Sequence, residues 1–487
     1  MPSHLRFSAL FVLILATISI GQQPANPLAP YLKETSCVLV LDHVRIIDGT
    51  GAAPQDDMRV NIENGKITRV QSAKLRNAYP LNAKVLDLSG RTVIPGIVGM
   101  HEHLFYPTPN RPKDGIQLYG EMADSAPRLY LAGGVTTART TGSVEPYTDL
   151  DMKQRIDAGK TPGPKLHITG PYLGGLGDLA PQLHTLSGPD EAARTVDYWA
   201  AEGVTSFKAY MDITPDELKA AIEHAHAKGL KITGHLCAVG FKEAAALGID
   251  DLEHGLTVDT EFFPGKKPDV CPDYSAAEED LVKNVKVDSP QIQELIRDLV
   301  AHRVAVTSTL AVFETFGPNR PPLARDLGVL EALTPAAREI FYRVRSHIAE
   351  NVGGESDVDA RLLKIEMQFE YAFAKAGGLL LAGCDPTGYG GVVPGFGDQR
   401  EIELLAEAGF TVPQSIQIAT QNGAKYLGED ATIGTIAQGK AADLVVLNGN
   451  PADKIEDIEK VETVFKDGVG YDPGKLIQSV QGLVGLR

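Results

Sequence analysis

From about residue 91 onward, short apolar segments alternate with segments that have the pattern of amphipathic helices. The eight segments with the composition of buried strands are TVIPGIVGMHEH, GVTTARTTG, KLHITGPYL, VTSFKAYM, LKITGHL, DDLEHG, VAVTSTL and GLLLAGCD. A typical connecting segment, TPDELKAAIEHAHAKG, opens with a Thr-x-x-Glu capping box at Thr214 and Glu217. Strands joined by helices lie parallel, and eight such units close into a (β/α)₈ TIM barrel. We therefore expect an α/β fold with a TIM barrel over residues 91–427.

The two ends of the chain differ in composition from the central part. Residues 22–90 contain short β-branched runs, and Asn64-Gly65 between two of them is typical of a type I′ hairpin. Residues 428–487 return to strand-like composition in TIGTIAQGKAADLVVLNGNP and VETVFKDG. We expect residues 22–90 and 428–487 to form one small β-sandwich domain together. The long segments 258–288 and 315–376 are expected to build a lid or substrate wall.

The overall charge and the first residues restrict where the protein acts and what it binds. The formal net charge of −17 disfavours nucleic acid as a partner, because its phosphates would be repelled. The apolar stretch Phe7–Ile20 is shorter than the roughly 20 residues of a membrane-spanning helix. Small residues at Ser19 and Gly21 then indicate a signal peptide over residues 1–21. We expect an exported protein, periplasmic or secreted, with no stable membrane partner; an uncleaved anchor is the alternative.

Four cysteines in a chain of 487 residues do not make a disulfide scaffold. Buried free thiols are the simplest expectation. One disulfide, for example between Cys237 and Cys271, is the alternative, and the sequence does not set the pairing. Cys384 precedes Asp385 in a predicted strand, so we expect its side chain on the opposite face, in the core.

Two pairs of histidines have the same spacing but lie in different kinds of segment. His101 and His103 end the first predicted barrel strand, where residues i and i+2 point to the same face. His224 and His226 lie in the predicted helix after Thr214, where residues two apart point about 200° away from each other. Only the first pair is therefore placed to bind one metal ion. The second pair is expected to be solvated or partly packed.

Other residues with metal-ligand or proton-transfer chemistry lie at or near the carboxyl ends of later predicted strands. They are Lys208 after strand four, His235 after strand five, His254 after strand six and Asp385 after strand eight. In a TIM barrel the carboxyl ends of the strands form the catalytic face. We therefore expect these side chains to converge with His101 and His103, which packing alone would not explain.

Some nearby side chains are candidates for binding a substrate. Tyr210 lies two residues after the strand-four lysine, and Arg139 ends the second strand, so both are candidates for a carboxylate. His184, in the loop after strand three, is a third candidate. Tyr172 and Tyr389, in the loops after strands three and eight, are further aromatic candidates. The alternatives are a packed aromatic ring for Tyr210, a salt bridge for Arg139 and an ordinary loop position for His184.

These motifs closely resemble those of the metal-dependent amidohydrolase superfamily over nearly the whole mature chain. Its binuclear pattern has H-x-H after strand one, Lys after strand four, His after strands five and six, and Asp after strand eight. The segments GKITRV, GRTVIPGIVGMHEHL and GTIAQGKAADLVVLNGNP are similar to its flanking β-sandwich and junctions. GVTTARTTGS and the close spacing of His235 and His254 are similar to the imidazolonepropionase-like branch. That branch includes Xaa-Pro dipeptidases, carboxypeptidases acting on N-acyl or peptidyl amino acids, and ochratoxin-type amidases.

The resemblance implies two divalent metal ions, with Zn²⁺ preferred, and carbon dioxide bound to a lysine. A lysine ammonium cannot ligate a metal, but a desolvated neutral amine can capture carbon dioxide as a bridging carbamate, N6-carboxylysine. The implied ligands are His101, His103, Asp385 and the Lys208 carbamate for one ion, and the carbamate, His235 and His254 for the other. Hydroxide formed from a water shared by the ions would attack a carbonyl, with Asp385 passing the proton to the leaving amine.

The resemblance favours a hydrolase that releases a C-terminal amino acid from a dipeptide or an N-acyl amino acid. Imidazolonepropionases are mononuclear and lack the metal-binding lysine, so Lys208 disfavours that activity. Hydrolysis of a lactone, cyclic amide or phosphotriester at the same centre is the main alternative. A non-catalytic scaffold is disfavoured because all six ligand residues are present, and a metal-sequestering protein would need the ions without turnover. Self-association as a homo-oligomer stays open.

Overall fold

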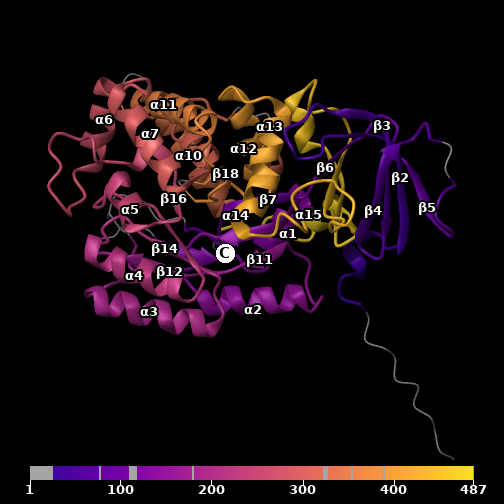
Figure 1. Cartoon of the computed structure of the whole chain (residues 1–487), viewed down its shortest axis with the longest axis horizontal. Coiled ribbons are helices and arrows are strands. Elements are labelled where there is room, and N and C mark those ends of the chain that lie inside the picture. Colours follow the sequence, from indigo (N-terminus) through magenta and orange to yellow (C-terminus); the bar gives the residue numbers. More distant parts are fainter. Residues whose placement is uncertain are drawn as a thin grey trace, which may run out of the picture.

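The computed structural model describes residues 26–75, 78–108, 118–177, 180–321, 327–351, 355–387 and 390–485. The predicted signal peptide at residues 1–21 lies outside these ranges. In Figure 1, strands from the first part of the chain form one side of the molecule, and strands accompanied by helices form a larger part beside it. Within the described ranges, no helix combines the length and hydrophobicity that crossing a bilayer requires.

A nine-stranded sheet is built from both ends of the chain. Its strands are β1 (Leu32–Glu34), β2 (Val38–Ile46), β3 (Gln55–Glu63), β4 (Lys66–Ser72), β5 (Lys84–Asp87), β6 (Thr92–Pro95), β19 (Leu444–Leu447), β20 (Val461–Lys466) and β21 (Val469–Tyr471). The order is β1-β21-β20-β19-β6-β2-β3-β4, with β5 paired to β2. The hairpin expected at Asn64-Gly65 joins β3 to β4, and these two residues have φ angles of 49° and 79°. Strand pairing therefore connects the two chain ends.

The central part of the chain forms parallel strands at the eight predicted positions. They are β7 (Ile97–Glu102), β10 (Val135–Thr140), β11 (Lys165–His167) with β12 (Thr169–Gly174), β14 (Ser206–Ala209), β15 (Lys231–Gly234), β16 (Asp251–Glu253), β17 (Ala305–Ser308) and β18 (Leu380–Ala382). The pairing orders are β11-β10-β7 and β13-β12-β14-β15-β16-β17-β18, where β13 is His184–Thr185. A hairpin of β8 (Phe105–Pro107) and β9 (Tyr119–Glu121) follows β7.

The last parallel strand lies next to the first. The backbone N–H of Asp385 donates a hydrogen bond to the carbonyl oxygen of His101 at 2.9 Å. A Cβ atom on Gly383 would lie 2.2 Å from the backbone nitrogen of His101, so this close approach requires glycine. The ends of β7 and β18, far apart in the sequence, are therefore brought together.

Helices connect the parallel strands and lie on both sides of them in Figure 1. They are α1 (Ala126–Gly133), α2 (Pro146–Asp157), α3 (Pro189–Glu202), α4 (Pro215–Ala227), α5 (Phe241–Leu247), α6 (Tyr274–Asn284), α7 (Pro290–His302), α8 (Leu310–Glu314), α9 (Leu327–Ala332), α10 (Pro335–Glu350), α11 (Glu355–Lys375), α12 (Phe396–Glu407), α13 (Val412–Gln417), α14 (Gly423–Leu427) and α15 (Pro473–Gln478). The predicted capping box of α4 is confirmed, because the Thr214 side chain accepts a hydrogen bond from the Glu217 N–H.

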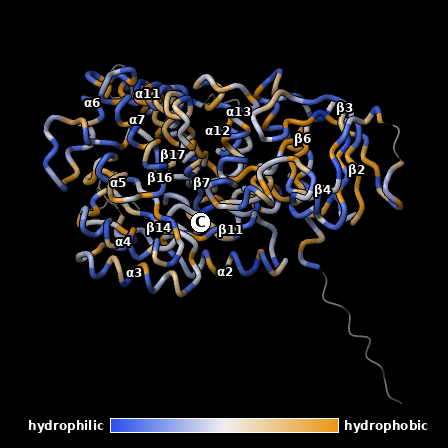
Figure 2. Tube along the Cα trace, in the orientation of Figure 1, coloured by the Kyte–Doolittle hydropathy of each residue, from blue (hydrophilic) through white to orange (hydrophobic). Residues whose placement is uncertain are grey.

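The hydrophobic faces of the helices pack on the parallel strands in one large core. In Figure 2, hydrophobic and hydrophilic residues alternate along α3 and α4, whereas β2 is hydrophobic over most of its length. On α4 the buried residues Leu218, Ala221, Ile222 and Ala225 recur every three or four positions, which gives the helix one apolar face. A second, smaller core lies in the nine-stranded sheet.

Two predicted strands are divided in the structure. TVIPGIVGMHEH separates at Gly96 into β6, which joins the nine-stranded sheet, and β7, which joins the parallel strands. A Cβ atom on Gly96 would lie 2.0 Å from Oγ1 of Thr136, so the chain passes close to β10 where it changes sheet. KLHITGPYL separates at Ile168 into β11 and β12. The sequence pattern predicted neither break, because the segments on both sides of each break are hydrophobic.

The last residues of the chain do not follow the prediction that all of 428–487 belongs with the sheet. The backbone N–H of Thr334 donates to the carbonyl oxygen of Val484 at 2.8 Å. Val480 and Val484 pack with Leu129 and Leu333, which belong to the helical part. The segment after β21 therefore covers apolar surface of the larger part instead of extending the sheet.

The long segments after strands six and seven carry helices. α6 lies in 258–288, and α9, α10 and α11 lie in 315–376. A disulfide joins Cys237 to Cys271, with 5.0 Å between their Cα atoms, so the expectation of free thiols was wrong for this pair. Cys384 is free and buried, as predicted. The disulfide ties the segment 258–288 to the residues that follow β15.

Candidate active site

Six predicted metal ligands lie at the carboxyl ends of five parallel strands. His101 is in β7 and His103 follows it; Lys208 is in β14; His235, His254 and Asp385 follow β15, β16 and β18. Because carboxyl ends of neighbouring parallel strands meet at one edge, the six side chains converge. The register confirms this for the middle of the set, where Lys208 pairs with Thr233 next to the end of β15.

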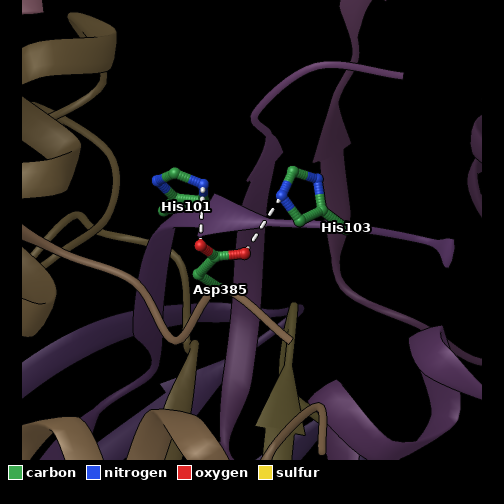
Figure 3. Close-up of side chains that lie close together, drawn as sticks. All are labelled: His101, His103 and Asp385. Carbon is green, nitrogen blue, oxygen red and sulfur yellow. Dashed lines mark ion pairs between the residues drawn. The ribbon is translucent and has the colours of Figure 1, made fainter. Parts of the chain in front are cut away.

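Asp385 lies between the two histidines of the first pair, and its carboxylate points toward both (Figure 3). Its Oδ2 is 3.7 Å from His101 Nε2, and its Oδ1 is 3.4 Å from His103 Nε2. One ligand atom from each of these three buried residues lies within 4.8 Å of the others. This spacing fits a single ion held by two imidazoles and a carboxylate.

The other predicted ligands surround the same point. Lys208 Nζ is 3.3 Å from His101 Nε2, and His254 Nε2 is 4.0 Å from Asp385 Oδ2. The rings of His235 and His254 have their centroids 4.4 Å apart. All six predicted residues therefore belong to one cluster.

Burial determines the protonation of these groups. It lowers the pKa of His235 to about 3, and it lowers the pKa values of His101 and His254 well below their usual range. Burial also lowers the pKa of Lys208 to about 8. Burial by itself raises the pKa of Asp385. The interactions with His101, His103 and Lys208 outweigh this effect and hold the pKa below its usual range. At neutral pH the cluster therefore offers neutral imidazoles and an ionised carboxylate.

This donor set fits divalent metal ions. Neutral imidazole and carboxylate are the usual ligands of Zn²⁺ and related ions. Among the residues that the structure describes, none forms a hydrogen bond with the buried Nε2 of His235, so this atom is available as a ligand. His254 and Asp385 have φ angles of 68° and 46°, and such strained non-glycine backbone clusters at active sites.

Two histidines are oriented by hydrogen bonds on their far side. His101 Nδ1 is 2.7 Å from Glu253 Oε2, and His254 Nδ1 is 2.7 Å from Thr309 Oγ1. Glu253 and Thr309 were missed by the sequence analysis. The signal for Glu253 was its i, i+2 spacing from Asp251 in β16, which places both carboxylates on one face of the strand.

Tyr210 and Tyr172 lie beside the cluster. The Tyr210 ring is 5.0 Å from the His235 ring and 5.2 Å from the Tyr172 ring, between centroids. Lys208 Nζ lies 5.6 Å from the centroid of the Tyr172 ring. These contacts place the Tyr210 ring beside a predicted ligand, and its role toward a substrate stays a prediction. Tyr389 lies outside the described residues.

The contacts of Arg139 and His184 give no support to the substrate roles predicted for them. Arg139 is buried, and its Nη2 donates to Asp251 and Glu253 at 2.8 and 2.9 Å, so it forms the salt bridge that was the alternative. His184 Nε2 is 3.3 Å from Glu191 Oε1, on the first turn of α3. The charge of this buried arginine is already balanced by two carboxylates, which disfavours a third, from a substrate.

The second pair of histidines lies on α4, as predicted. His224 Nδ1 is 3.2 Å from Asp197 Oδ2, whereas His226 Nε2 is 2.9 Å from Asp250 Oδ2. The two rings therefore have separate partners on the outside of the parallel strands.

A family model for the amidohydrolase family matches residues 92–352 and 383–470, well over half of the chain. The chain belongs to the amidohydrolase family. The predicted resemblance and the predicted enzyme class, a hydrolase that acts on amide bonds, are thereby confirmed.

Comparisons with individual proteins agree with this family. A dihydroorotase from Anaeromyxobacter dehalogenans (strain 2CP-C) is 29% identical over 204 residues, which is 41% of this chain and only 42% of that protein. A bottromycin amidohydrolase structure has a TM-score of 0.67 at 20% identity and covers 94% of both chains. The structure of a Xaa-Pro dipeptidase has a TM-score of 0.64 at 19% identity, over 89% of this chain and all of that one. At these identities the structural likeness concerns the fold.

Proposed function

We propose that this protein is a binuclear metal-dependent hydrolase that releases a C-terminal amino acid from a dipeptide or an N-acyl amino acid. The observation that carries the proposal is the convergence of four histidines, a buried lysine and an aspartate at the ends of five parallel strands. The proposal includes a closed (β/α)₈ barrel, which the contact of Asp385 with His101 supports. It also includes a β-sandwich built on the sheet of both chain ends.

His101, His103 and Asp385 would hold one ion, His235 and His254 the other, and the Lys208 carbamate would bridge them. We propose Zn²⁺ for both positions, because the donors are imidazole and carboxylate. When bound, the ions would polarise the scissile carbonyl and activate water as the nucleophile. The buried amine of Lys208, with a pKa of about 8, supports carbamate formation because about a tenth of the amine is neutral at pH 7, far more than for an ordinary lysine.

Asp385 would carry the proton. Its pKa is below the usual range, so its carboxylate is ionised and able to accept a proton from the attacking water. It would then donate that proton to the nitrogen of the leaving amine, which has to be protonated to depart. The 3.4 Å distance between His103 Nε2 and Asp385 Oδ1 supports a carboxylate held in a fixed orientation during this transfer.

The test is a mixed library of Xaa-Pro, Xaa-Arg and other dipeptides together with N-acyl amino acids, incubated with zinc-loaded protein. Mass spectrometry would identify the amino acids that are released, with Asp385→Asn as the control. Release by the wild type and not by the variant is the expected result. If a protein that carries about two ions releases nothing, the amide substrate class is wrong.

Hydrolysis of a cyclic amide is the second candidate. The similarity to a dihydroorotase favours it, since dihydroorotate is a cyclic amide. The site would be the same, and a lactone or phosphotriester would also fit its chemistry. Cyclic substrates offered to the same zinc-loaded protein would separate this candidate from the first.

We also propose that the protein is exported and that its signal peptide, residues 1–21, is removed by cleavage. The disulfide between Cys237 and Cys271 supports an oxidising compartment. N-terminal sequencing of the protein from the medium or periplasm of its host would test this, and a chain that begins at Met1 in the cytoplasm would contradict it.

Replacement of Tyr210 by phenylalanine is expected to raise KM about tenfold and to leave the metal content unchanged. The phenol lies beside His235, and a hydrogen bond to a charged group contributes about 1.5–3 kcal/mol. Steady-state kinetics on the substrate found above would measure the change. His184→Ala is the control and should have wild-type KM, because His184 is paired with Glu191. An unchanged KM for the Tyr210 variant would assign that ring to packing.

A further inference from the structure

Arg139 and Glu253 connect the backbone of the first parallel strand to the imidazole of His101. Glu253 Oε2 is 2.7 Å from His101 Nδ1, and Arg139 Nη2 donates to Glu253 Oε1 at 2.9 Å. Arg139 Nε also donates to the carbonyl oxygen of Met100 at 2.8 Å. Since Met100 directly precedes His101, one arginine holds both the backbone before this histidine and the acid against its ring.

We propose that Glu253, held by Arg139, is a positioning residue that fixes the His101 ring with Nε2 toward the metal ions. This inference rests on the proposed metal centre. Arg139 and Thr233 donate to Oε1 of Glu253, so its Oε2 is placed to accept the proton that His101 carries on Nδ1. The lone pair is then on Nε2, which faces Lys208 Nζ at 3.3 Å and Asp385 Oδ2 at 3.7 Å.

Glu253 itself is fixed from several directions. The Thr233 hydroxyl donates to Glu253 Oε1 at 2.5 Å, so this oxygen accepts from both Thr233 and Arg139. Arg139 is held in turn by Asp251, whose Oδ2 is 2.8 Å from Nη2. Asp251 and Glu253 are fully buried. A carboxylate restrained in this way restricts the ring that it contacts, which is what a metal ligand needs for a fixed geometry.

The position of Glu253 in the sequence relates it to the ligands of both proposed ions. It directly precedes His254, so one strand end provides a ligand for one ion and the acid that orients a ligand of the other. His254 has its own partner, Thr309 Oγ1, at 2.7 Å from Nδ1. The effect of Glu253 is therefore expected at the ion that His101 holds.

A glutamine at position 253 would keep the shape but could not serve both neighbours. If its oxygen faced Arg139, its NH₂ group would face His101 and favour the tautomer with the proton on Nε2, which cannot ligate a metal. If its oxygen faced His101, its NH₂ group would oppose the donors of Arg139 and Thr233. Either orientation weakens metal binding through His101.

The experiment compares the wild type, Glu253→Gln and Arg139→Lys in the full chain. Glu401→Gln is the matched control, because Glu401 is also buried but accepts hydrogen bonds from Ser308 and the Ala311 N–H and not from a predicted ligand. Zn²⁺ affinity would be measured by competition with a chromophoric chelator, and the ligand field by the visible spectrum of the Co²⁺ form. Thermal unfolding of the metal-free proteins would report on folding.

We expect Glu253→Gln to bind one of the two ions about 10- to 100-fold more weakly and to change the Co²⁺ spectrum. Arg139→Lys keeps the charge but loses the fork that spans Met100 and Glu253, so we expect a smaller loss at the same ion. The control should match the wild type. Wild-type affinity and spectrum in a folded Glu253→Gln protein would overturn the inference. If that variant does not fold, Arg139→Lys decides by the same criterion.

The outcomes separate this inference from the proposed function. A wild type that binds no divalent ion would contradict both. A wild type that binds two ions but hydrolyses no amide would contradict only the proposed reaction, and the affinity comparison would still decide the role of Glu253.

Discussion

Replacing Asp385 by asparagine is expected to lower kcat by about 10²- to 10⁴-fold, the usual contribution of a general acid–base group. Asparagine has nearly the same shape, but its amide neither accepts a proton from water nor donates one to a leaving amine. Asp385 lies 3.4 Å from His103 and 3.7 Å from His101, so the neutral residue would also weaken the proposed metal site. Single-turnover kinetics and metal analysis on the same preparations would separate the two effects.

Asp149→Asn is the matched control for that experiment. Asp149 is as deeply buried as the cluster, and it accepts a hydrogen bond from the Ser143 hydroxyl instead of facing the histidines. It should keep its kcat, even if its thermal stability changes. An Asp385→Asn protein with full metal content and wild-type kcat would eliminate the proposed proton carrier.

The position of the cluster could be predicted from the sequence because it depends on two simple periodicities. Strand spacing puts His101 and His103 on one face, and helical spacing separates His224 from His226. The carboxyl ends of parallel strands lie at one edge, so the convergence of Lys208 and Asp385 can be predicted without any knowledge of the loops. These rules depend only on the backbone geometry of strands and helices, and the pattern of a single sequence predicts which segments are which.

The roles of charged neighbours could not be predicted in the same way. Arg139 ends a strand and so met the criterion for a substrate-binding residue, but its partners Asp251 and Glu253 come from β16, more than a hundred positions away. Which side chain satisfies a buried charge depends on packing between strands, and the pattern along one strand does not contain it. The disulfide was undetermined for the same reason, since cysteine spacing does not fix distance in space.

The sequence predicted that strands from both ends of the chain belong together, but it did not predict where the residues after the last strand lie. The pairing of β19 with β6 brings the two chain ends into one sheet, in agreement with their shared β-branched composition. The segment after β21 has apolar residues that suit either part. It lies on the larger part, where Val480 and Val484 belong to the same hydrophobic cluster as Leu129 and Leu333. Composition identifies what must be buried, but it does not identify the surface that buries it.

Lys208→Ala is expected to reduce the bound metal from about two ions to about one and to lower kcat/KM about 10³-fold. The loss of a bridging ligand and of one Lewis acid removes several kcal/mol of transition-state stabilisation, and each 1.36 kcal/mol is about tenfold in rate. Metal analysis and kinetics would measure both changes. Lys165→Ala is the control, since Lys165 pairs with Asp443 and Asp467 away from the cluster. Two tightly bound ions in the Lys208 variant would rule out the bridge.

The pKa of Lys208 gives that prediction a pH dependence with a definite sign. Burial lowers this pKa to about 8, and only the neutral amine reacts with carbon dioxide. The neutral fraction rises with pH, so metal-free protein supplied with Zn²⁺ and bicarbonate should regain activity faster above about pH 8 than below it. Isotope-labelled bicarbonate would introduce a carbamate carbon that NMR detects in the wild type and not in Lys208→Ala. Equal rates of recovery on both sides of that pH, without a carbamate signal, would mean that the lysine acts as an unmodified amine. The second ion would then lack an anionic bridge.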